Sequence, residues 1–502
     1  MDKKSWIFGS VLVLAMVGVA VGLNFWHSQN GSENGAVSDV IDIDNGDLKI
    51  NWEKYTPINV DLSGTYTIAA AGVYHFTGSL EDGGIAIKAN IETAAVKIIL
   101  DNVSIKNSSG PAIACYNADD LVIELVGENH LEDGISYSGY DEDVKGVIYS
   151  KSDLTFTGDG ELVLKGNYAD GIVGKDDLTF RNGTYNITAA DDAIRGKDSV
   201  HIANGDFVIT TKGDGIKSTN DTKIDKGFVL IENGNIEITS GDDGIHAEKS
   251  LIIDGSELEI KNSYEGLEAQ KIIINNGETT IFSNDDGINA SSGSSTTTNT
   301  NVRGATPGAM GDVDESSVIT VNGGKLYVNA AGDGIDSNGW IYFNGGSVVV
   351  DGPTNNGNGA LDAGAGIVMN GGTVIAVGAS GMAESLGSSS TVYNASIFFD
   401  STLPKGTSIA IKDSNNETVL SHTSAKTFSH MAIGTKGFEN GQTYTIYIDG
   451  EKYSSFTIAD IVTMVGNGGY MNAMPGGNTP AGNAGNAPAG NAGNVPSDRP
   501  RR

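Results

Sequence analysis

Apolar and polar residues alternate in short runs through most of this chain. The runs Leu178–Phe180, Tyr185–Ile187 and Leu258–Ile260 each place a polar residue between two apolar ones. Because successive side chains of a strand point to opposite faces, such a run buries one face and exposes the other. The pattern therefore predicts many short β-strands and few helices.

The strands belong to a repeat of about 22 residues, since Ile172, Ile194 and Ile216 are spaced by that interval. One marker of the repeat is Asp-Gly-Ile or a close variant. The other marker is a turn of Asn-Gly or Asp-Gly, which begins at Asp159, Asn182, Asn204, Asn233, Asp254, Asn276, Asn322, Asn344 and Asn370. Glycine there permits the left-handed backbone that such turns need.

A repeat of this length with short strands is typical of one coil of a parallel β-helix. A leucine-rich repeat would need a Leu-x-x-Leu-x-Leu pattern, and a propeller blade needs about 40 residues. Equivalent positions in successive coils stack about 4.8 Å apart. We therefore expect one buried aliphatic ladder, formed by Ile172, Ile194, Ile216, Ile245, Leu267, Ile288, Ile335 and Leu361.

The expected organisation has five parts. Residues 1–30 hold a long apolar run after Lys3 and Lys4, which is either a cleaved signal peptide or a membrane anchor. Residues 31–69 form a linker and N-terminal cap, and residues 70–390 form the parallel β-helix. Residues 391–465 form a β-rich C-terminal module with hairpin signals, and the Gly/Asn/Pro/Ala tail 466–502 is disordered. Either reading of the N-terminus predicts an extracellular or cell-surface protein.

Two insertions lengthen the turn that follows the aliphatic ladder. They span residues 217–226 and 291–315. The coils between them carry His246, Glu248 and Glu268 just after the ladder residue, which suggests a groove. The alternative is two tolerated surface insertions.

Charge narrows the possible partners. The chain has 63 acidic and 31 basic residues and a formal net charge of −32. Nucleic acid is not expected as a partner, because phosphate binding requires Lys and Arg. The single cysteine, Cys115, excludes an intramolecular disulfide framework and a cysteine-based zinc site.

Acidic residues precede the aliphatic ladder in seven coils. Stacked carboxylates about 5 Å apart repel one another unless they are solvated or bind a cation. Calcium suits such a site, because it takes six to eight oxygen ligands in irregular geometry. The alternative is a solvated acidic edge. The candidate metal ligands are Asp170, Asp191, Asp192, Asp214, Asp242, Asp243, Glu265, Asp285, Asp286 and Asp333.

Aromatic residues suggest a carbohydrate ligand. Trp340 and Tyr342 alternate along one strand, and Tyr168 and Tyr264 closely precede acidic positions. These four are the candidate carbohydrate-binding residues. No catalytic residue is assigned, because His-Glu-x-x-His, Gly-x-Ser-x-Gly and phosphate-loop motifs are absent. A lyase reading would need a basic residue beside the acidic ladder, namely Arg195 or Lys217.

The Asp-Asp-Gly-Ile coils, the Asn-Gly-Gly turns and the export segment resemble a bacterial family of pectate-lyase-like carbohydrate-binding proteins. The resemblance covers roughly residues 50–460. It implies a right-handed parallel β-helix, binding of polygalacturonate or cellulose, and no catalysis. It also implies calcium at stacked positions, on Asp191, Asp192, Asp214, Asp242, Asp243, Asp285 and Asp286. Glu265 and loop 291–315 depart from the family pattern.

The expected function is thus calcium-dependent, non-catalytic binding of a polysaccharide at the cell surface. A polysaccharide lyase and an adhesin-like structural protein remain as alternatives. The oligomeric state is not predicted.

Overall fold

The computed structural model describes residues 46–89, 94–292 and 313–467. Residues 1–45, which include the expected signal or anchor, lie outside the described residues, as do tail residues 468–502. No helix in the described ranges is long and apolar enough to cross a membrane. Two 3₁₀ helices, η1 (Gly46–Lys49) and η2 (Trp52–Lys54), precede the strands.

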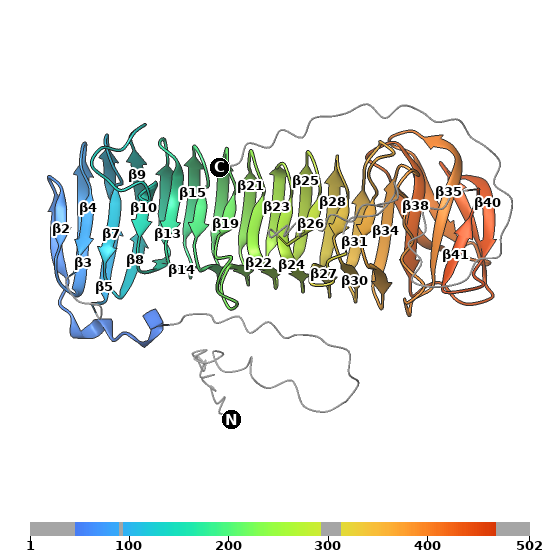
Figure 1. Ribbon diagram of the computed structural model, residues 1–502, viewed down its shortest axis with the longest axis horizontal. Helices are drawn as coiled ribbons and strands as arrows, with labels where there is room; N and C mark the ends of the chain where they lie inside the picture. Colours follow the sequence, from blue (N-terminus) through green and yellow to red (C-terminus); the bar gives the residue numbers. More distant parts are fainter. Residues whose placement is uncertain (1–45, 90–93, 293–312, 468–502) are drawn as a thin grey trace, which may run out of the picture. The chain divides into compact units, whose positions relative to one another are not determined.

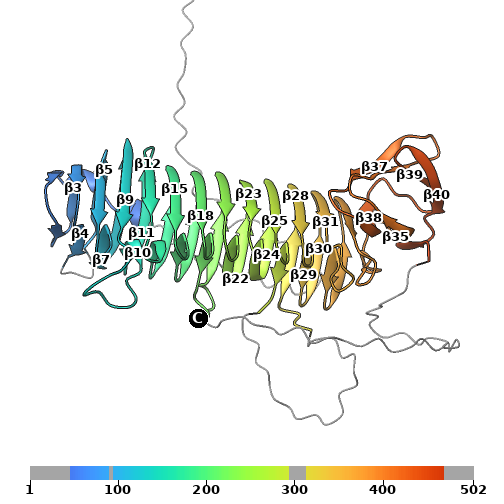
Figure 2. The same cartoon turned by 90° about the horizontal axis from the view of Figure 1, so that it is seen from above.

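Thirty-seven strands form one sheet that is mostly parallel, which confirms the all-β expectation. Most of its strands recur in threes along the chain and pair in parallel with the strand three places further on, and we call one such set of three a coil. Figures 1 and 2 show these strands following one another in sequence order, from blue to orange. The pairing defines three stacks, which we call the first, second and third ladders. Where one strand runs through two ladders, the parallel partner is two places further on.

The first ladder carries the Asp-Gly-Ile repeat. Its strands are β2 (Tyr66–Ile68), β4 (Ile85–Lys88), β7 (Ile113–Asn117), β10 (Gly146–Ser150), β13 (Asp170–Gly174), β16 (Ile194–Gly196), β19 (Ile216–Ser218), the start of β22 (Ile245–Ile253), the start of β24 (Leu267–Ile274), β26 (Ile288–Ala290), β29 (Ile335–Ser337) and β32 (Leu361–Ala363).

The second ladder follows it in each coil. Its strands are β1 (Ile58–Leu62), β3 (Gly72–Leu80), β5 (Val96–Asp101), β8 (Asp120–Val126), β11 (Asp153–Gly158), β14 (Asp177–Phe180), β17 (Ser199–Ile202), β20 (Phe228–Ile231), the ends of β22 and β24, β27 (Val318–Val321), β30 (Trp340–Phe343) and β33 (Gly366–Met369).

The third ladder completes the coil. Its strands are the end of β3, β6 (Ser104–Asn107), β9 (Glu128–Asp133), β12 (Glu161–Lys165), β15 (Thr184–Ala189), β18 (Asp206–Thr211), β21 (Asn235–Thr239), β23 (Glu257–Asn262), β25 (Glu278–Ser283), β28 (Lys325–Ala330), β31 (Ser347–Asp351) and β34 (Thr373–Gly378).

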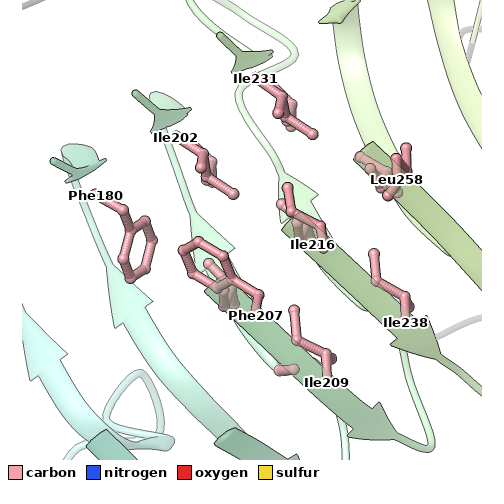
Figure 3. Close-up of a cluster of buried hydrophobic side chains, with 14 of the residues drawn as sticks. Phe180, Ile202, Phe207, Ile209, Ile216, Ile231, Ile238 and Leu258 are labelled. Carbon is pink, nitrogen blue, oxygen red and sulfur yellow. The ribbon is translucent and has the colours of Figure 1, made fainter. Parts of the chain in front are cut away.

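The aliphatic ladder is confirmed in full register. Ile172 pairs with Ile194, Ile194 with Ile216 and Ile216 with Ile245, and the series continues through Leu267, Ile288 and Ile335 to Leu361. All eight are buried. Inward side chains of all three ladders, such as Ile216, Ile202 and Phe207, face one another in Figure 3. At about 1.5–3 kcal/mol for each buried aliphatic side chain, this continuous core drives the stacking of the coils.

Asparagine side chains also stack on one another at the turns between strands, as the repeat predicted. Asn344 donates from Nδ2 to Asn322 Oδ1 at 2.9 Å and accepts from Asn370 Nδ2 at 3.0 Å. One pair in this stack differs from the expectation. The repeat marked Asn276 as the turn residue, but Asn322 Nδ2 donates to Asn275 Oδ1 instead. At this turn the positive φ of +93° falls on Gly277, two residues after Asn275, just as Gly324 and Gly346 follow Asn322 and Asn344 by two residues.

Replacing Asn344 by Ala should lower the thermal stability of the chain modestly. Two side-chain hydrogen bonds are lost at an exposed position, and the expected cost is about 1 kcal/mol. Asn233→Ala is the control, because Asn233 also precedes a turn glycine but makes no side-chain hydrogen bond within the described ranges. Equal thermal midpoints for the two variants would contradict a stabilising role for the stacked asparagines.

Antiparallel strands follow the last coil. β38 (Phe428–Thr435) pairs antiparallel with β34, and also with β35 (Asn394–Leu403), which pairs with β41 (Val462–Val465). β38 thereby covers the last edge of the third ladder, which would otherwise expose unpaired backbone groups. A separate four-stranded sheet has the order β37 (Thr418–Thr423), β36 (Ser408–Lys412), β39 (Thr443–Ile448) and β40 (Glu451–Thr457).

Candidate carbohydrate and cation site on the first ladder

The acidic side chains before the aliphatic ladder form a hydrogen-bonded stack. Oδ1 of Asp170 accepts from the backbone N–H of Asp192 at 3.3 Å, and Oδ1 of Asp192 accepts from the N–H of Asp214 at 3.0 Å. The pattern continues from Asp214 to Asp243, from Asp243 to Glu265 and from Asp286 to Asp333. One carboxylate oxygen of each thus holds the next coil in register.

This acidic stack is not a solvated edge over most of its length. Asp170, Asp192, Asp214, Asp243 and Glu265 are buried, and Asp286 and Asp333 are half-buried. Since a buried carboxylate is costly without compensation, its charge must be met by protein groups, by protons or by a cation. The outward residue that follows each aliphatic ladder residue determines which of these applies.

Basic side chains occupy that outward position in three successive coils. Nη1 of Arg195 lies 3.4 Å from Oδ2 of Asp170, and Lys217 pairs with Asp214. Nδ1 of His246 lies 2.9 Å from Glu268 Oε2 and 3.3 Å from Asp243 Oδ2. Burial alone would lower the pKa of His246, but its bonds to Asp243 and Glu268 raise it to about 10. His246 is therefore charged at neutral pH. Basic side chains thus offset part of the negative charge from Asp170 to Asp243, and we call this part of the stack the basic half.

Three of the four coils that follow His246 carry an acid at the same outward position, and the fourth carries Asn289. Glu268 pairs in register with Asn289, Asn289 with Asp336 and Asp336 with Asp362. Burial, followed by the carboxylates of Asp362 and Asp333, raises the pKa of Asp336 to about 8. Burial and Asp362 likewise raise the pKa of Glu384 to about 8. Burial also raises the pKa of Asp192 and of Asp243 to about 7, but Lys217 and His246 oppose that shift. The influences on Asp336 and Glu384 include none from a basic side chain.

Three of these acids converge. One oxygen each from Asp286, Asp333 and Asp336 lies within 4.8 Å of the other two. Two oxygens bound to one calcium ion are at most about 5 Å apart, twice the metal–ligand distance. The donors are all hard oxygen ligands, so their chemistry and spacing fit calcium. We call Asp286, Asp333, Asp336, Asp362 and Glu384 the acidic end of the first ladder.

The other metal candidates are distributed along the stack. Asp191, Asp242 and Asp285 each precede an acidic residue of the stack. A Cβ on Gly332 would meet the carboxylates of both Asp285 and Asp286 at about 2.5 Å, so glycine is needed where these two side chains approach the next coil. Asp285 therefore borders the acidic end, whereas Asp191 and Asp242 border the basic half.

Sequence reasoning missed Asp336, Asp362 and Glu384. Asp336 and Asp362 directly follow the ladder residues Ile335 and Leu361, so the repeat itself carried the signal. Glu384 lies in the non-repetitive segment after β34, where periodicity gives no information.

The four aromatic candidates do not form one surface. Trp340 and Tyr342 share the outer face of β30, as predicted, with ring centroids 5.9 Å apart and 22° between the planes. Both are half-buried on this outer face, so they do not belong to the internal core. Tyr168 and Tyr264 precede first-ladder strands instead and are about 40% exposed. The ring of Tyr168 stacks on Tyr137, with centroids 4.4 Å apart.

Two ion pairs hold the first insertion, residues 217–226, against the second ladder. Lys223 donates to Asp198 Oδ2 at 2.7 Å, and Lys226 donates to Asp177 Oδ2 at 2.7 Å. Most of the second insertion, residues 293–312, lies outside the described residues. The predicted groove between the two insertions remains a prediction.

Comparison with known proteins finds sequences similar to this chain that are described as carbohydrate-binding. A family model described as "Carbohydrate-binding domain-containing protein" matches residues 63–306. A protein of Acetivibrio thermocellus with the same description is 32% identical over 165 residues, which are 32% of this chain and 56% of the relative. The chain thus spans about half the length of that relative.

A solved structure is also similar, namely "Structure of the polysaccharide lyase-like protein from C. thermocellum, Gadolinium derivative". It is 27% identical, with a TM-score of 0.36, over 44% of this chain and 84% of that chain.

Proposed function

We propose that this protein binds polysaccharide at the cell surface without cleaving it, and that calcium at the acidic end of the first ladder is required for binding acidic sugars. We further propose that the three ladders wind as a right-handed parallel β-helix. The match of residues 63–306 to a carbohydrate-binding family supports the ligand class. The observation that carries the calcium proposal is the convergence of Asp286, Asp333 and Asp336.

Charge explains why calcium and an acidic sugar belong together. A chain with a net charge of −32 repels polygalacturonate. A bound calcium ion supplies positive charge that both protein and uronate carboxylates can share. Calcium-dependent retention on polygalacturonate is therefore expected, whereas a neutral glucan such as cellulose binds through aromatic rings and is insensitive to chelators. Trp340 and Tyr342 provide such rings.

The basic half of the stack supports binding over lyase chemistry. Burial lowers the pKa of Lys217, but the carboxylates of Asp214 and Asp192 raise it well above the ordinary lysine value. A general base must be unprotonated near the working pH, so Lys217 is poorly suited to that role. Arg195 is paired with Asp170, and the guanidinium does not lose its proton in proteins.

Retention of the full chain on insoluble polygalacturonate and on cellulose, with calcium and with chelator, tests this function. Ultraviolet absorbance of unsaturated products is followed in the same samples. We expect calcium-dependent retention on polygalacturonate and constant absorbance. Rising absorbance would identify a lyase. Loss of thermal stability in chelator without retention on either polymer would identify a structural protein in which calcium only rigidifies the coils.

A further inference from the structure

The outer face of the first ladder is hollow at its N-terminal end. Ala86 pairs in register with Ala114, and Ala114 with Tyr149, so two small residues precede a large one at the outward position. Later coils carry Val173, Arg195 and larger polar side chains there. The two alanines leave room for a cavity of about 300 Å³. This volume falls at the lower limit for small-molecule pockets, about 300–1,000 Å³.

Two tyrosines wall this cavity. Tyr116, in β7, has its ring centroid 6.4 Å from that of Tyr149, and Lys88 Nζ lies 5.4 Å from the Tyr116 ring. Tyr140 comes from the segment between β9 and β10, and its ring lies 5.6 Å from Tyr137.

The segment that carries Tyr140 is anchored from both sides. Tyr137 Oη lies 2.9 Å from Asp133 Oδ2 and 2.9 Å from the Gly146 carbonyl oxygen. The Tyr137 ring also stacks on Tyr168. On the other side, a Cβ on Gly110 would come within 2.4 Å of the Tyr140 ring, so the ring lies directly on this glycine. Tyr140 is nevertheless 37% exposed, which leaves ring surface for a ligand.

Polar groups complete the lining. Asp82 Oδ1 accepts from the backbone N–H and the hydroxyl of Ser108, both at 2.9 Å. A carboxylate has about four acceptor sites, so Asp82 retains acceptor capacity for ligand hydroxyls. Asn107 also lines the cavity and is locked in place by the Pro111 carbonyl and the Ser109 N–H.

We propose that this cavity is a calcium-independent subsite for a neutral pyranose unit of a polysaccharide. This inference rests on the proposed carbohydrate-binding function and adds a second site to it, at the opposite end of the first ladder from the acidic end. Tyrosine offers a large apolar face with little conformational entropy to lose, which suits the C–H face of a pyranose. Asp82 accepts hydrogen bonds from neutral hydroxyls but repels a uronate carboxylate.

The test measures binding of a soluble cello-oligosaccharide to the full chain in chelator, by calorimetry. Tyr140→Ala should weaken binding about 3- to 10-fold, the range expected for losing one aromatic contact. Tyr140→Phe keeps the ring and should bind nearly as the wild type does. Gly110→Ala should also weaken binding, because the new methyl group displaces the Tyr140 ring. Tyr453→Ala is the matched control, since Tyr453 is also 37% exposed but lies in β40.

The outcomes separate this subsite from the proposed function. Cello-oligosaccharide binding that is unchanged in Tyr140→Ala and Gly110→Ala would overturn the subsite, as would the absence of binding in chelator. Calcium-dependent retention on polygalacturonate would still support the main proposal in either case. Conversely, Tyr140-dependent binding without any retention on polygalacturonate would support the subsite and overturn the calcium proposal.

Discussion

Asp336→Asn should stabilise the chain in chelator and destabilise it in calcium. Without calcium, burial and the neighbouring carboxylates raise the pKa of Asp336 to about 8, so this carboxyl must take up a proton when the chain folds at neutral pH, and the substitution removes that cost. At pH 7, about 3 units above the unfolded pKa of an aspartate, protonation costs about 4 kcal/mol, which is the upper limit of the expected gain. With calcium, the variant loses a ligand. Calcium at about 100 times its dissociation constant stabilises the wild type by about 2.7 kcal/mol, and most of this should disappear.

Thermal midpoints of the wild type and the variant, each with calcium and with chelator, measure this reversal. Asp214→Asn is a matched contrast from the basic half of the stack. It leaves the partly buried Lys217 without its partner, so it should destabilise the chain under both conditions. Asp119→Asn changes an exposed acid elsewhere and should have little effect. A calcium-independent midpoint in the wild type, or equal shifts of Asp336→Asn in both conditions, would contradict a cation site at the acidic end.

The opposite behaviour expected for Asp214 and Asp336 follows from one outward position in the coil. Along the first ladder this position reads Tyr149, Val173, Arg195, Lys217, His246, Glu268, Asn289, Asp336 and Asp362. The inward position stays aliphatic throughout. A repeat that fixes the core thus leaves the outer face free to change from aromatic to basic to acidic, and ligand chemistry can vary along it without cost to the fold.

The repeat spacing was sufficient to predict the core but not the charge balance. Ile172, Ile194 and Ile216 gave the register directly, because a buried ladder permits no slip of one residue. The acidic stack was visible for the same reason. Its pairing with Arg195, Lys217 and His246 depended on side chains that reach one position further along the strand. Glu384 reaches the same surface from a segment outside the repeat, where only the folded chain brings it near Asp362.

The sequence pattern also could not predict which of two adjacent asparagines stacks on the neighbouring coils. Asn275 and Asn276 are adjacent, and either suits a turn before glycine. Only the stacking on Asp254 and Asn322 selects Asn275. Likewise, β22 and β24 each run through two ladders without a break, although the other coils interrupt the strand at this point.

Asp351→Ala should loosen the four-stranded sheet from the coils. Asp351 belongs to β31 of the third ladder and is 1% exposed. Its carboxylate accepts from Tyr327 Oη at 2.9 Å, from His422 Nε2 at 2.8 Å and from Ser424 Oγ at 3.0 Å. His422 lies in β37, and Ser424 directly follows this strand. One buried carboxylate therefore joins the large parallel sheet to the four-stranded sheet. Its removal leaves several buried donors without a partner, which should cost about 3–5 kcal/mol.

Acid should have the same effect on the wild type. Burial raises the pKa of Asp351, but the hydrogen bond and charge of His422 and the bond from Tyr327 hold it below its ordinary value. A carboxyl whose folded pKa is depressed contributes stability above its unfolded pKa of about 3.9 and loses it as the pH falls through the folded value. The junction between the sheets should therefore open below about pH 4, and Asp351→Ala should remove this acid-sensitive step.

Hydrogen exchange resolved by segment distinguishes local release from general unfolding. In Asp351→Ala at neutral pH, the amides of β36, β37, β39 and β40 should exchange faster, while those of β13–β18 should stay protected. Asp400→Asn is the control, because Asp400 accepts from Tyr453 on the exposed side of the same region and should leave exchange unchanged. If the variant exchanged like the wild type in the four-stranded sheet, the apolar contacts of β34 and β35 with that sheet, and not Asp351, would be what holds the two parts together.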